Sequence, residues 1–298
     1  MPTGQGQLQG PDQAERIREL EAEAAMLRAR LAVAEARMRS YRALLKDQNP
    51  PLAAATDTYQ VLTYVSDGLA TWNKSIDFFE GPRFQSAYRR GMDSGHAIGR
   101  APGSNHDIRI EWRVAICCWA GWHARQLPGD FVECGTNTGI YSLAVCEYVD
   151  FNALDKSFWL FDTYAGHPPE QISEQERRLA DGGAAGLPSS YPDCYDIAQR
   201  NFATFPRAQL VRGKVPDTLG TVAIDRVAYL SIDMNLEYPE RAALEFFWPR
   251  LVPGGIVVLD DYGWLQHRAQ RDSHDAFARA RGLEIFGLPT GQGLLLKP

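Results

Sequence analysis

Cysteine is scarce in this chain, and no two cysteines have the spacing of a metal site. The 298 residues include five cysteines, an odd number, and none belongs to a Cys-x-x-Cys pair. Disulfide scaffolds need paired cysteines, and structural zinc sites take closely spaced ones. We therefore expect neither a disulfide framework nor a zinc site, and a reducing cytoplasm is the expected location.

Long apolar runs and clusters of positive charge are also missing. No stretch approaches the roughly 20 apolar residues that span a bilayer. The first residues, MPTGQGQLQGPDQ, lack the basic start and apolar run of a secretory signal. The formal net charge is -6, whereas a nucleic-acid surface needs clustered Lys and Arg. These absences predict no membrane span and no nucleic-acid partner.

The N-terminal segment has a composition and a period of its own. Residues 1–11 are rich in Gly, Gln and Pro, which predicts a disordered tail. Over residues 12–48 apolar side chains recur at spacings of three and four, flanked by Glu and Arg. This heptad pattern predicts a coiled-coil helix through which the chain forms a homo-oligomer. The alternative is a single amphipathic helix packed on its own domain.

Two segments are expected to cover a site. Residues 49–105 mix aromatic residues with Gly and Pro without a long period, which predicts a small cap or lid of short helices and loops. The polar stretch 166–193 is long for a loop inside an α/β domain, and such loops are usually lids or disordered. Between them, residues 108–126 predict an amphipathic helix that buries Ile108, Trp112 and Trp119 on one face.

Residues 106–298 have the alternating pattern of an α/β domain. Short apolar runs predict strands at 130–134, 158–161, 209–212, 227–232, 256–259, 283–288 and 293–296, with helices between most of them. Alternating strands and helices form a parallel sheet covered on both faces. The last two strands are joined by a tight turn and must be antiparallel. The expected fold class is a Rossmann-like α/β sheet, parallel with a C-terminal antiparallel hairpin, as in class I methyltransferases.

The first strand leads into a glycine-containing loop, Glu133-Cys134-Gly135-Thr136-Asn137-Thr138-Gly139, and then a helix. Glycines let the backbone turn sharply and approach a ligand, and Glu133 places a carboxylate where it can meet a cationic amine. The loop is neither Gly-x-Gly-x-x-Gly nor a P-loop, which disfavours a pyrophosphate site and a nicotinamide-dependent dehydrogenase.

Asp162 ends the next strand, where an acid can accept hydrogen bonds from ribose hydroxyls. The alternative for Asp162 is a helix N-cap. Asp233, Asp260 and Asp261 follow two strands that are expected to be neighbours. Convergent carboxylates repel one another unless a cation binds, and an all-oxygen site suits Mg²⁺ or Ca²⁺. The alternative here is that Asp260 or Asp261 caps the following helix.

Four stretches resemble the macrocin-type (TylF-like) O-methyltransferases: GDFVECGTNTG, FWLFDTYAGHP, YLSIDMNLEYPERAALEFFWPRLVPGGIVVLDDYGW and PTGQGLLLKP. The resemblance covers residues 105–298 and implies S-adenosylmethionine as cofactor. It also implies that Asp233, Asp260 and Asp261 hold a divalent metal such as Mg²⁺, which in turn holds the acceptor hydroxyls. The expected cofactor-binding set is Glu133, Cys134, Gly135, Thr136, Gly139, Tyr141, Ser142, Asp162, Thr163, Gly213, Lys214 and Asp233.

One position departs from the family pattern. The family usually has Asp-Gly-Asp, whose second Asp can serve as base, whereas this chain has Asn235. We assign catalysis to His267, as replacement base, and Asp260; His167 is a second choice, and a surface role for His267 is the alternative. The expected function is metal-assisted O-methylation of a sugar or glycan-like hydroxyl. The alternatives are a polyketide or catechol-like acceptor, and a catalytically degenerate scaffold oligomerised by the coiled coil.

Overall fold

The computed structural model describes residues 62–97, 107–181 and 191–298. Val61–Pro298 forms a unit of its own. The predicted disordered tail, the coiled coil over residues 12–48 and parts of both predicted lids lie outside the described residues. Within the described residues, no helix is long and apolar enough to cross a membrane.

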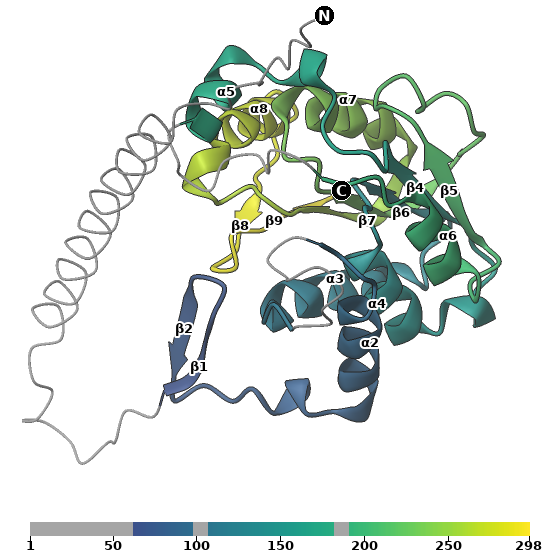
Figure 1. Cartoon of the computed structure of the whole chain (residues 1–298), viewed down its shortest axis with the longest axis vertical. Coiled ribbons are helices and arrows are strands. Elements are labelled where there is room, and N and C mark those ends of the chain that lie inside the picture. The colour runs from purple at the N-terminus through teal and green to yellow at the C-terminus, as the bar shows by residue number, and fades with distance from the viewer. Residues whose placement is uncertain (1–61, 98–106, 182–190) are drawn as a thin grey trace, which may run out of the picture. The chain divides into compact units, whose positions relative to one another are not determined.

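A seven-stranded sheet lies at the centre of this unit, in the order β5-β4-β3-β6-β7-β9-β8 (Figure 1). Five neighbouring strands are parallel, while β9 runs antiparallel to both β7 and β8. The predicted α/β sheet with a C-terminal antiparallel hairpin is therefore confirmed. The strands are β3 (Asp130–Cys134), β4 (Phe158–Asp162), β5 (Ala208–Arg212), β6 (Val227–Ile232), β7 (Leu251–Leu259), β8 (Phe286–Gly287) and β9 (Gly293–Leu296).

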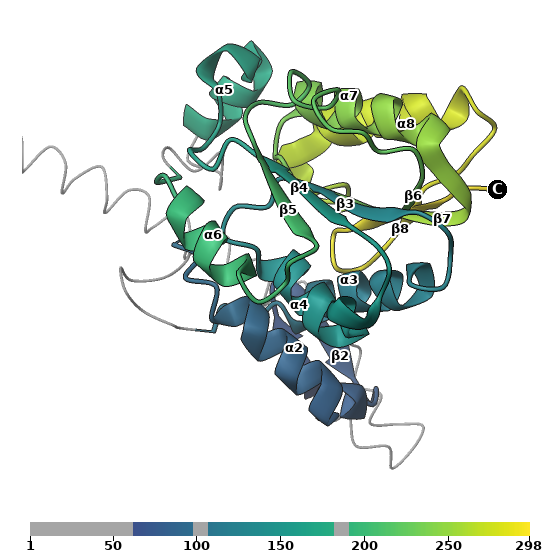
Figure 2. The same cartoon turned by 90° about the vertical axis from the view of Figure 1, so that its right-hand side faces the viewer.

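The apolar runs form strands because helices cover them on both faces. Every residue of β6 is buried, as expected of a central parallel strand. On one face of the sheet lie α2 (Pro82–Met92), α3 (Glu111–Ala124) and α4 (Ile140–Val149). On the other lie α7 (Glu237–Phe247) and α8 (Arg268–Arg279), as Figure 2 shows. The helix α6 (Tyr195–Phe202) follows at the β5 end of the sheet.

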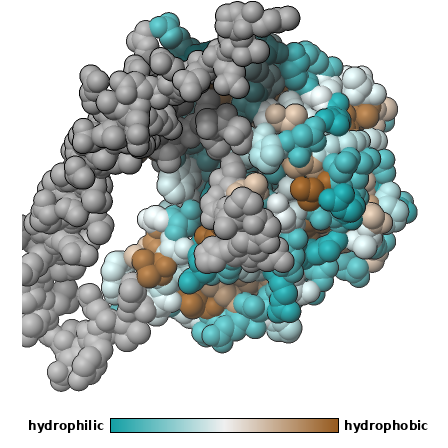
Figure 3. Space-filling view, in the orientation of Figure 1, coloured by the Kyte–Doolittle hydropathy of each residue, from teal (hydrophilic) through white to brown (hydrophobic). Residues whose placement is uncertain are grey.

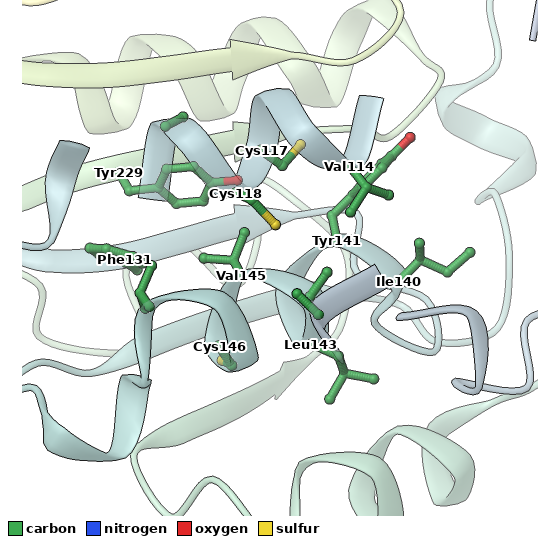
Figure 4. Packing of buried hydrophobic residues seen from close by; sticks show 14 of the residues in the cluster. Val114, Cys117, Cys118, Phe131, Ile140, Tyr141, Leu143, Val145, Cys146 and Tyr229 are labelled. Atoms are coloured by element: carbon green, nitrogen blue, oxygen red, sulfur yellow. The ribbon is translucent and has the colours of Figure 1, made fainter. Parts of the chain in front are cut away.

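Small residues let the helices of one layer pack closely. Cys117, Cys118 and Gly121 of α3 are buried, and a Cβ atom added at Gly121 would lie 2.7 Å from Val145 of α4. Figure 4 shows the thiols of Cys117, Cys118 and Cys146 inside this core. The predicted burial of Trp119 is wrong, because its side chain is 52% exposed. The close approach of α3 to α4 needs small side chains on the buried face.

The segment expected to be a cap of short helices contains an unpredicted β-hairpin, formed by β1 (Leu62–Ser66) and β2 (Leu69–Trp72). Its helix α2 is part of the layer on the sheet and packs against α4 (Figure 2). The second expected lid contains the helix α5 (Glu174–Asp181). On the part of the surface that Figure 3 leaves uncovered, hydrophobic residues form separate patches among hydrophilic ones.

Candidate functional site

A cavity of about 550 Å³ opens at the carboxyl ends of the parallel strands. The loops after the strands β3 to β7 converge at this edge of the sheet, and each contributes at least one residue to the wall of the cavity. Crevices of this kind are the usual ligand sites of open α/β sheets. The residues of its wall that the sequence had singled out are Gly135, Thr136, Tyr141, Asp162, Thr163, His167, Gly213, Asp233, Asn235, Asp260, Asp261 and His267.

The loop after β3 requires glycine at position 135. Gly135 has a φ of +95°, and a Cβ atom there would lie 1.9 Å from the carbonyl oxygen of Asp233. The Gly135 N–H donates to the carbonyl of Phe161 at 2.8 Å, which ties the loop to the end of β4. The backbone at position 135 therefore lies so close to Asp233 that only glycine, which has no side chain, fits there.

Asp162, at the end of β4, holds the loop after β3 in place through hydrogen bonds. Its carboxylate accepts hydrogen bonds from the backbone N–H groups of Asn137 at 2.7 Å and Tyr164 at 2.6 Å. Burial raises the pKa of Asp162, and the hydrogen bonds from the backbone oppose that shift. Each carboxylate oxygen can accept more than one hydrogen bond, so Asp162 can also receive ribose hydroxyls from the cavity.

Some of the predicted cofactor residues line the cavity and others do not. Glu133 is 1% exposed, and its Oε2 atom has no hydrogen-bond partner among the residues that the structure describes. Burial raises the pKa of Glu133 to about 8. Lys214 is exposed on the surface and binds Glu170 at 2.6 Å. Five members of the predicted set do not line the cavity: Glu133, Cys134, Gly139, Ser142 and Lys214. Which of the twelve residues contact a bound cofactor stays a prediction.

Asp260 is held by neighbours that the sequence reasoning missed. Arg113 Nη1 donates to Asp260 Oδ2 at 2.6 Å, and Gln292 Nε2 donates to Oδ1 at 2.9 Å. Arg113 also binds Asp67, on the β1–β2 turn, through Nε at 2.8 Å. Arg113 and Gln292 therefore fix the orientation of Asp260 and balance its charge. The predicted catalytic role of Asp260 stays a prediction.

The amide of Asn235 lies between the other two carboxylates. Its Nδ2 donates to Asp233 Oδ1 at 3.2 Å and to Asp261 Oδ2, while its Oδ1 accepts from the Tyr191 hydroxyl at 3.2 Å. Burial and the charge of Asp260 raise the pKa of Asp233 well above its usual range. Burial also raises the pKa of Asp261.

The predicted three-aspartate metal site does not fit this arrangement. Among the described residues, no group of three His, Cys, Asp or Glu side chains is placed to hold a metal ion. Mg²⁺ needs free oxygen lone pairs around one point. Here N–H donors face both oxygens of Asp260 and one oxygen each of Asp233 and Asp261. An Mg²⁺ ion at these carboxylates would meet these donors and the repulsion of the Arg113 guanidinium.

Two histidines predicted from the sequence reach the cavity. His267 Nε2 lies 3.7 Å from Asp261 Oδ2, and its side chain is 13% exposed. The surface position considered for His267 is thus not what the structure has. His167 also lines the cavity, with its ring against Tyr191, and burial lowers its pKa.

Only one of the missed residues carried a signal in the sequence. Gln292 is fully buried and lies in the stretch PTGQGLLLKP. A polar residue directly before an apolar strand is a signal for a functional position. Arg113 looks like an ordinary cation on an amphipathic helix, and Asp67 like an ordinary turn residue. No local pattern distinguishes them, because their pairing joins residues far apart in the chain.

Glu240 of α7 supports the loop that carries Asn235. Its Oε1 accepts from the N–H groups of Met234 and Asn235, both at 3.0 Å, and from Gln270 Nε2 at 2.7 Å. The side chain is 2% exposed, and burial raises its pKa to about 8. The Glu240 carboxyl therefore stabilises the loop that carries Met234 and Asn235.

The raised pKa of Glu240 predicts a pH-dependent stability. The folded protein holds this proton up to about pH 8, whereas the unfolded chain loses it near 4.5, so stability falls as pH rises between these values. The free energy of unfolding, measured with denaturant, should fall between pH 5.5 and pH 8.5 in the unmodified protein. In Glu240→Gln this fall should be smaller by at least about 1 kcal/mol. Glu245→Gln, an exposed change on the same helix, is the control. Equal losses in all three proteins would contradict the assignment.

Comparison with known proteins agrees with the geometry of the site. The macrocin-O-methyltransferase (TylF) family profile matches residues 117–285, more than half of the chain. Mycinamicin III 3''-O-methyltransferase of Micromonospora griseorubida is 28% identical over 148 residues, which cover 46% of this chain and 56% of that protein. A tetracenomycin-C 4'-O-methyltransferase of Streptomyces olivaceus is 29% identical over 151 residues, 47% of this chain and 55% of that one.

The chain spans about half the length of these curated relatives. Among solved structures, the O-methyltransferase NovP has a TM-score of 0.53 at 20% identity, over 72% of this chain and 88% of that one. This likeness concerns the fold alone. With the family profile matching β3 to α8, the chain belongs to the macrocin-O-methyltransferase (TylF) family.

Proposed function

We propose that the protein transfers a methyl group from S-adenosylmethionine to a hydroxyl of a small-molecule acceptor. The observation that carries this proposal is that one cavity joins two corners of different chemistry. One corner has the Gly135 loop and Asp162, and the other has His267 and Asp261. A reaction between two bound molecules needs both corners within one enclosure.

The cofactor corner fits an adenosyl group. Gly135 brings the backbone against the cavity, and Asp162 presents a carboxylate at the end of the neighbouring strand. The unpartnered, buried Oε2 of Glu133 lies behind the same loop. When bound, S-adenosylmethionine supplies a methyl group already activated by the sulfonium charge. The protein therefore has chiefly to position the acceptor oxygen and remove its proton.

His267 is the proposed base. A neutral imidazole can accept the hydroxyl proton, and the Asp261 carboxyl lies 3.7 Å from Nε2 of His267. Asn235 occupies the position where the family usually has Asp, and an amide cannot take this role near neutral pH. In an in-line transfer the acceptor oxygen would bond to the methyl carbon as the bond from that carbon to the sulfonium sulfur breaks, leaving the neutral thioether, and His267 would take the hydroxyl proton.

The acceptor proposed first is a sugar hydroxyl. The relatives include a tetracenomycin-C 4'-O-methyltransferase whose substrate name contains a rhamnosyl group, together with a demethyldecarbamoylnovobiocin O-methyltransferase. A polyketide or catechol-like hydroxyl is the second class to assay. Metal assistance is not part of this proposal, because the carboxylates are engaged by N–H donors. Oligomerisation through residues 12–48 and a cytoplasmic location stay predictions.

A non-catalytic scaffold is the competing function, and Asn235 is the residue that favours it. The two functions differ in cofactor binding, since a scaffold has no need of S-adenosylmethionine. Calorimetric titration of the full chain with this cofactor therefore separates them. Binding at micromolar strength supports the enzyme, and absence of binding supports the scaffold.

Replacing Asp162 with alanine is expected to weaken S-adenosylmethionine binding about 10- to 100-fold, since a hydrogen bond to a charged group contributes about 1.5–3 kcal/mol. Calorimetry measures the change directly. Asp155→Ala, at a fully exposed carboxylate, is the matched control and should bind as the unmodified chain does. An unchanged affinity in Asp162→Ala would remove Asp162 from the site.

A further inference from the structure

Arg113 is a buried cation that connects two carboxylates on different parts of the fold. It binds Asp67 on the turn between β1 and β2 at 2.8 Å, and Asp260 after β7 at 2.6 Å. The side chains of Arg113 and Asp260 are 17% and 3% exposed. An Asp–Arg–Asp group of this kind is held from both sides, so the guanidinium has a fixed position.

The charge of Arg113 falls where the carboxylates of the cavity converge. Asn235 Nδ2 donates both to Asp233 Oδ1 at 3.2 Å and to Asp261 Oδ2, so these two carboxylates lie within reach of one amide, and Asp260 directly precedes Asp261. Burial alone lowers the pKa of Arg113, but Asp260 and Asp67 outweigh burial and hold it well above its usual range. The guanidinium is therefore permanently charged, and it compensates the excess negative charge at this edge of the sheet.

The residues that complete this arrangement lie outside the segment that matches the family. Arg113 and Asp67 precede residue 117, and Gln292 follows residue 285. Together they occupy both oxygens of Asp260. The three residues come from the unpredicted hairpin, from α3 and from the turn before β9.

We propose that Arg113 is the resident cation of the cavity and occupies the electrostatic role of a divalent metal, so that the protein does not bind Mg²⁺ there. Two N–H groups of Arg113 remain beyond those that bind Asp67 and Asp260, and Arg113 lines the cavity. They can face the acceptor oxygen as it loses its proton. Removing the positive charge should leave uncompensated carboxylates and create affinity for a divalent cation.

Titration with Mn²⁺, followed by electron paramagnetic resonance of the free ion, tests this proposal on the full chain. We expect no saturable binding at millimolar Mn²⁺ for the unmodified protein. Arg113→Met should gain at least about tenfold in affinity, because three carboxylates then share a space without a cation. Arg113→Lys keeps the charge and should not gain. Arg207→Met, which removes a surface ion pair with Asp155, is the control.

Two results would overturn the proposal. One is stoichiometric Mn²⁺ binding by the unmodified chain, and the other is a folded Arg113→Met variant that gains no affinity. If Arg113→Met does not fold, as judged by circular dichroism, the unmodified chain and Arg113→Lys still decide the question. Failure of the proposed methyl transfer would appear separately, as absence of S-adenosylmethionine binding, and would leave the Mn²⁺ titration unaffected.

Discussion

Replacing His267 with asparagine is expected to lower kcat by about 10²- to 10⁴-fold, the usual contribution of a positioned general base. The reason is the geometry of the acceptor corner. His267 lines the cavity with Nε2 at 3.7 Å from Asp261, and the amide of Asn235 cannot accept the proton in its place. The measurement is methyl transfer from labelled S-adenosylmethionine to a hydroxylated acceptor, with sugars assayed first.

A loss of turnover has to be separated from a loss of binding. Calorimetry of His267→Asn should give the same S-adenosylmethionine affinity as the unmodified chain, because His267 belongs to the other corner of the cavity. His123→Asn is the control, since His123 binds the Gly254 carbonyl at 2.8 Å and does not line the cavity. A His267→Asn variant with full kcat would end the proposed role and direct the search to His167.

Replacing Gly135 with alanine is expected to abolish detectable cofactor binding and to destabilise the fold. A Cβ atom there would lie 1.9 Å from the Asp233 carbonyl oxygen, and the φ of +95° is strained for any L-residue. Strain at such a position costs about 1–3 kcal/mol. In addition, the clash with the Asp233 carbonyl forces the backbone to move. Moving that backbone displaces both the cofactor loop and the loop that carries Asp233.

The chain offers a matched control for this substitution. A Cβ atom added at Gly220 meets nothing within 4 Å. Gly220→Ala should therefore bind S-adenosylmethionine normally and unfold at the same denaturant concentration as the unmodified chain. Equal behaviour of the two variants would show that the tight fit at Gly135 does not control the site.

The sheet could be predicted from the sequence because its signals are local. Each strand is a short apolar run, and the glycine loop and Asp162 follow directly where two such runs end. Parallel strands bring their carboxyl ends to one edge, and Asp162, Asp233 and Asp260, which each end or follow a strand, all line the cavity there. The same reasoning fails for α3, where periodicity placed Trp119 inside and close packing on α4 placed it outside.

The sequence by itself determined the fold class, the family motifs and the edge of the sheet at which the site lies. Tertiary structure alone decided which charges face one another there. Arg113, Asp67 and Gln292 come from a helix, a hairpin turn and the C-terminal strand turn. Arg113 and Gln292 bind Asp260, and Asp67 binds Arg113. A cluster of aspartates predicts a need for a cation, but whether a metal or an arginine supplies it depends on contacts between residues up to 179 positions apart.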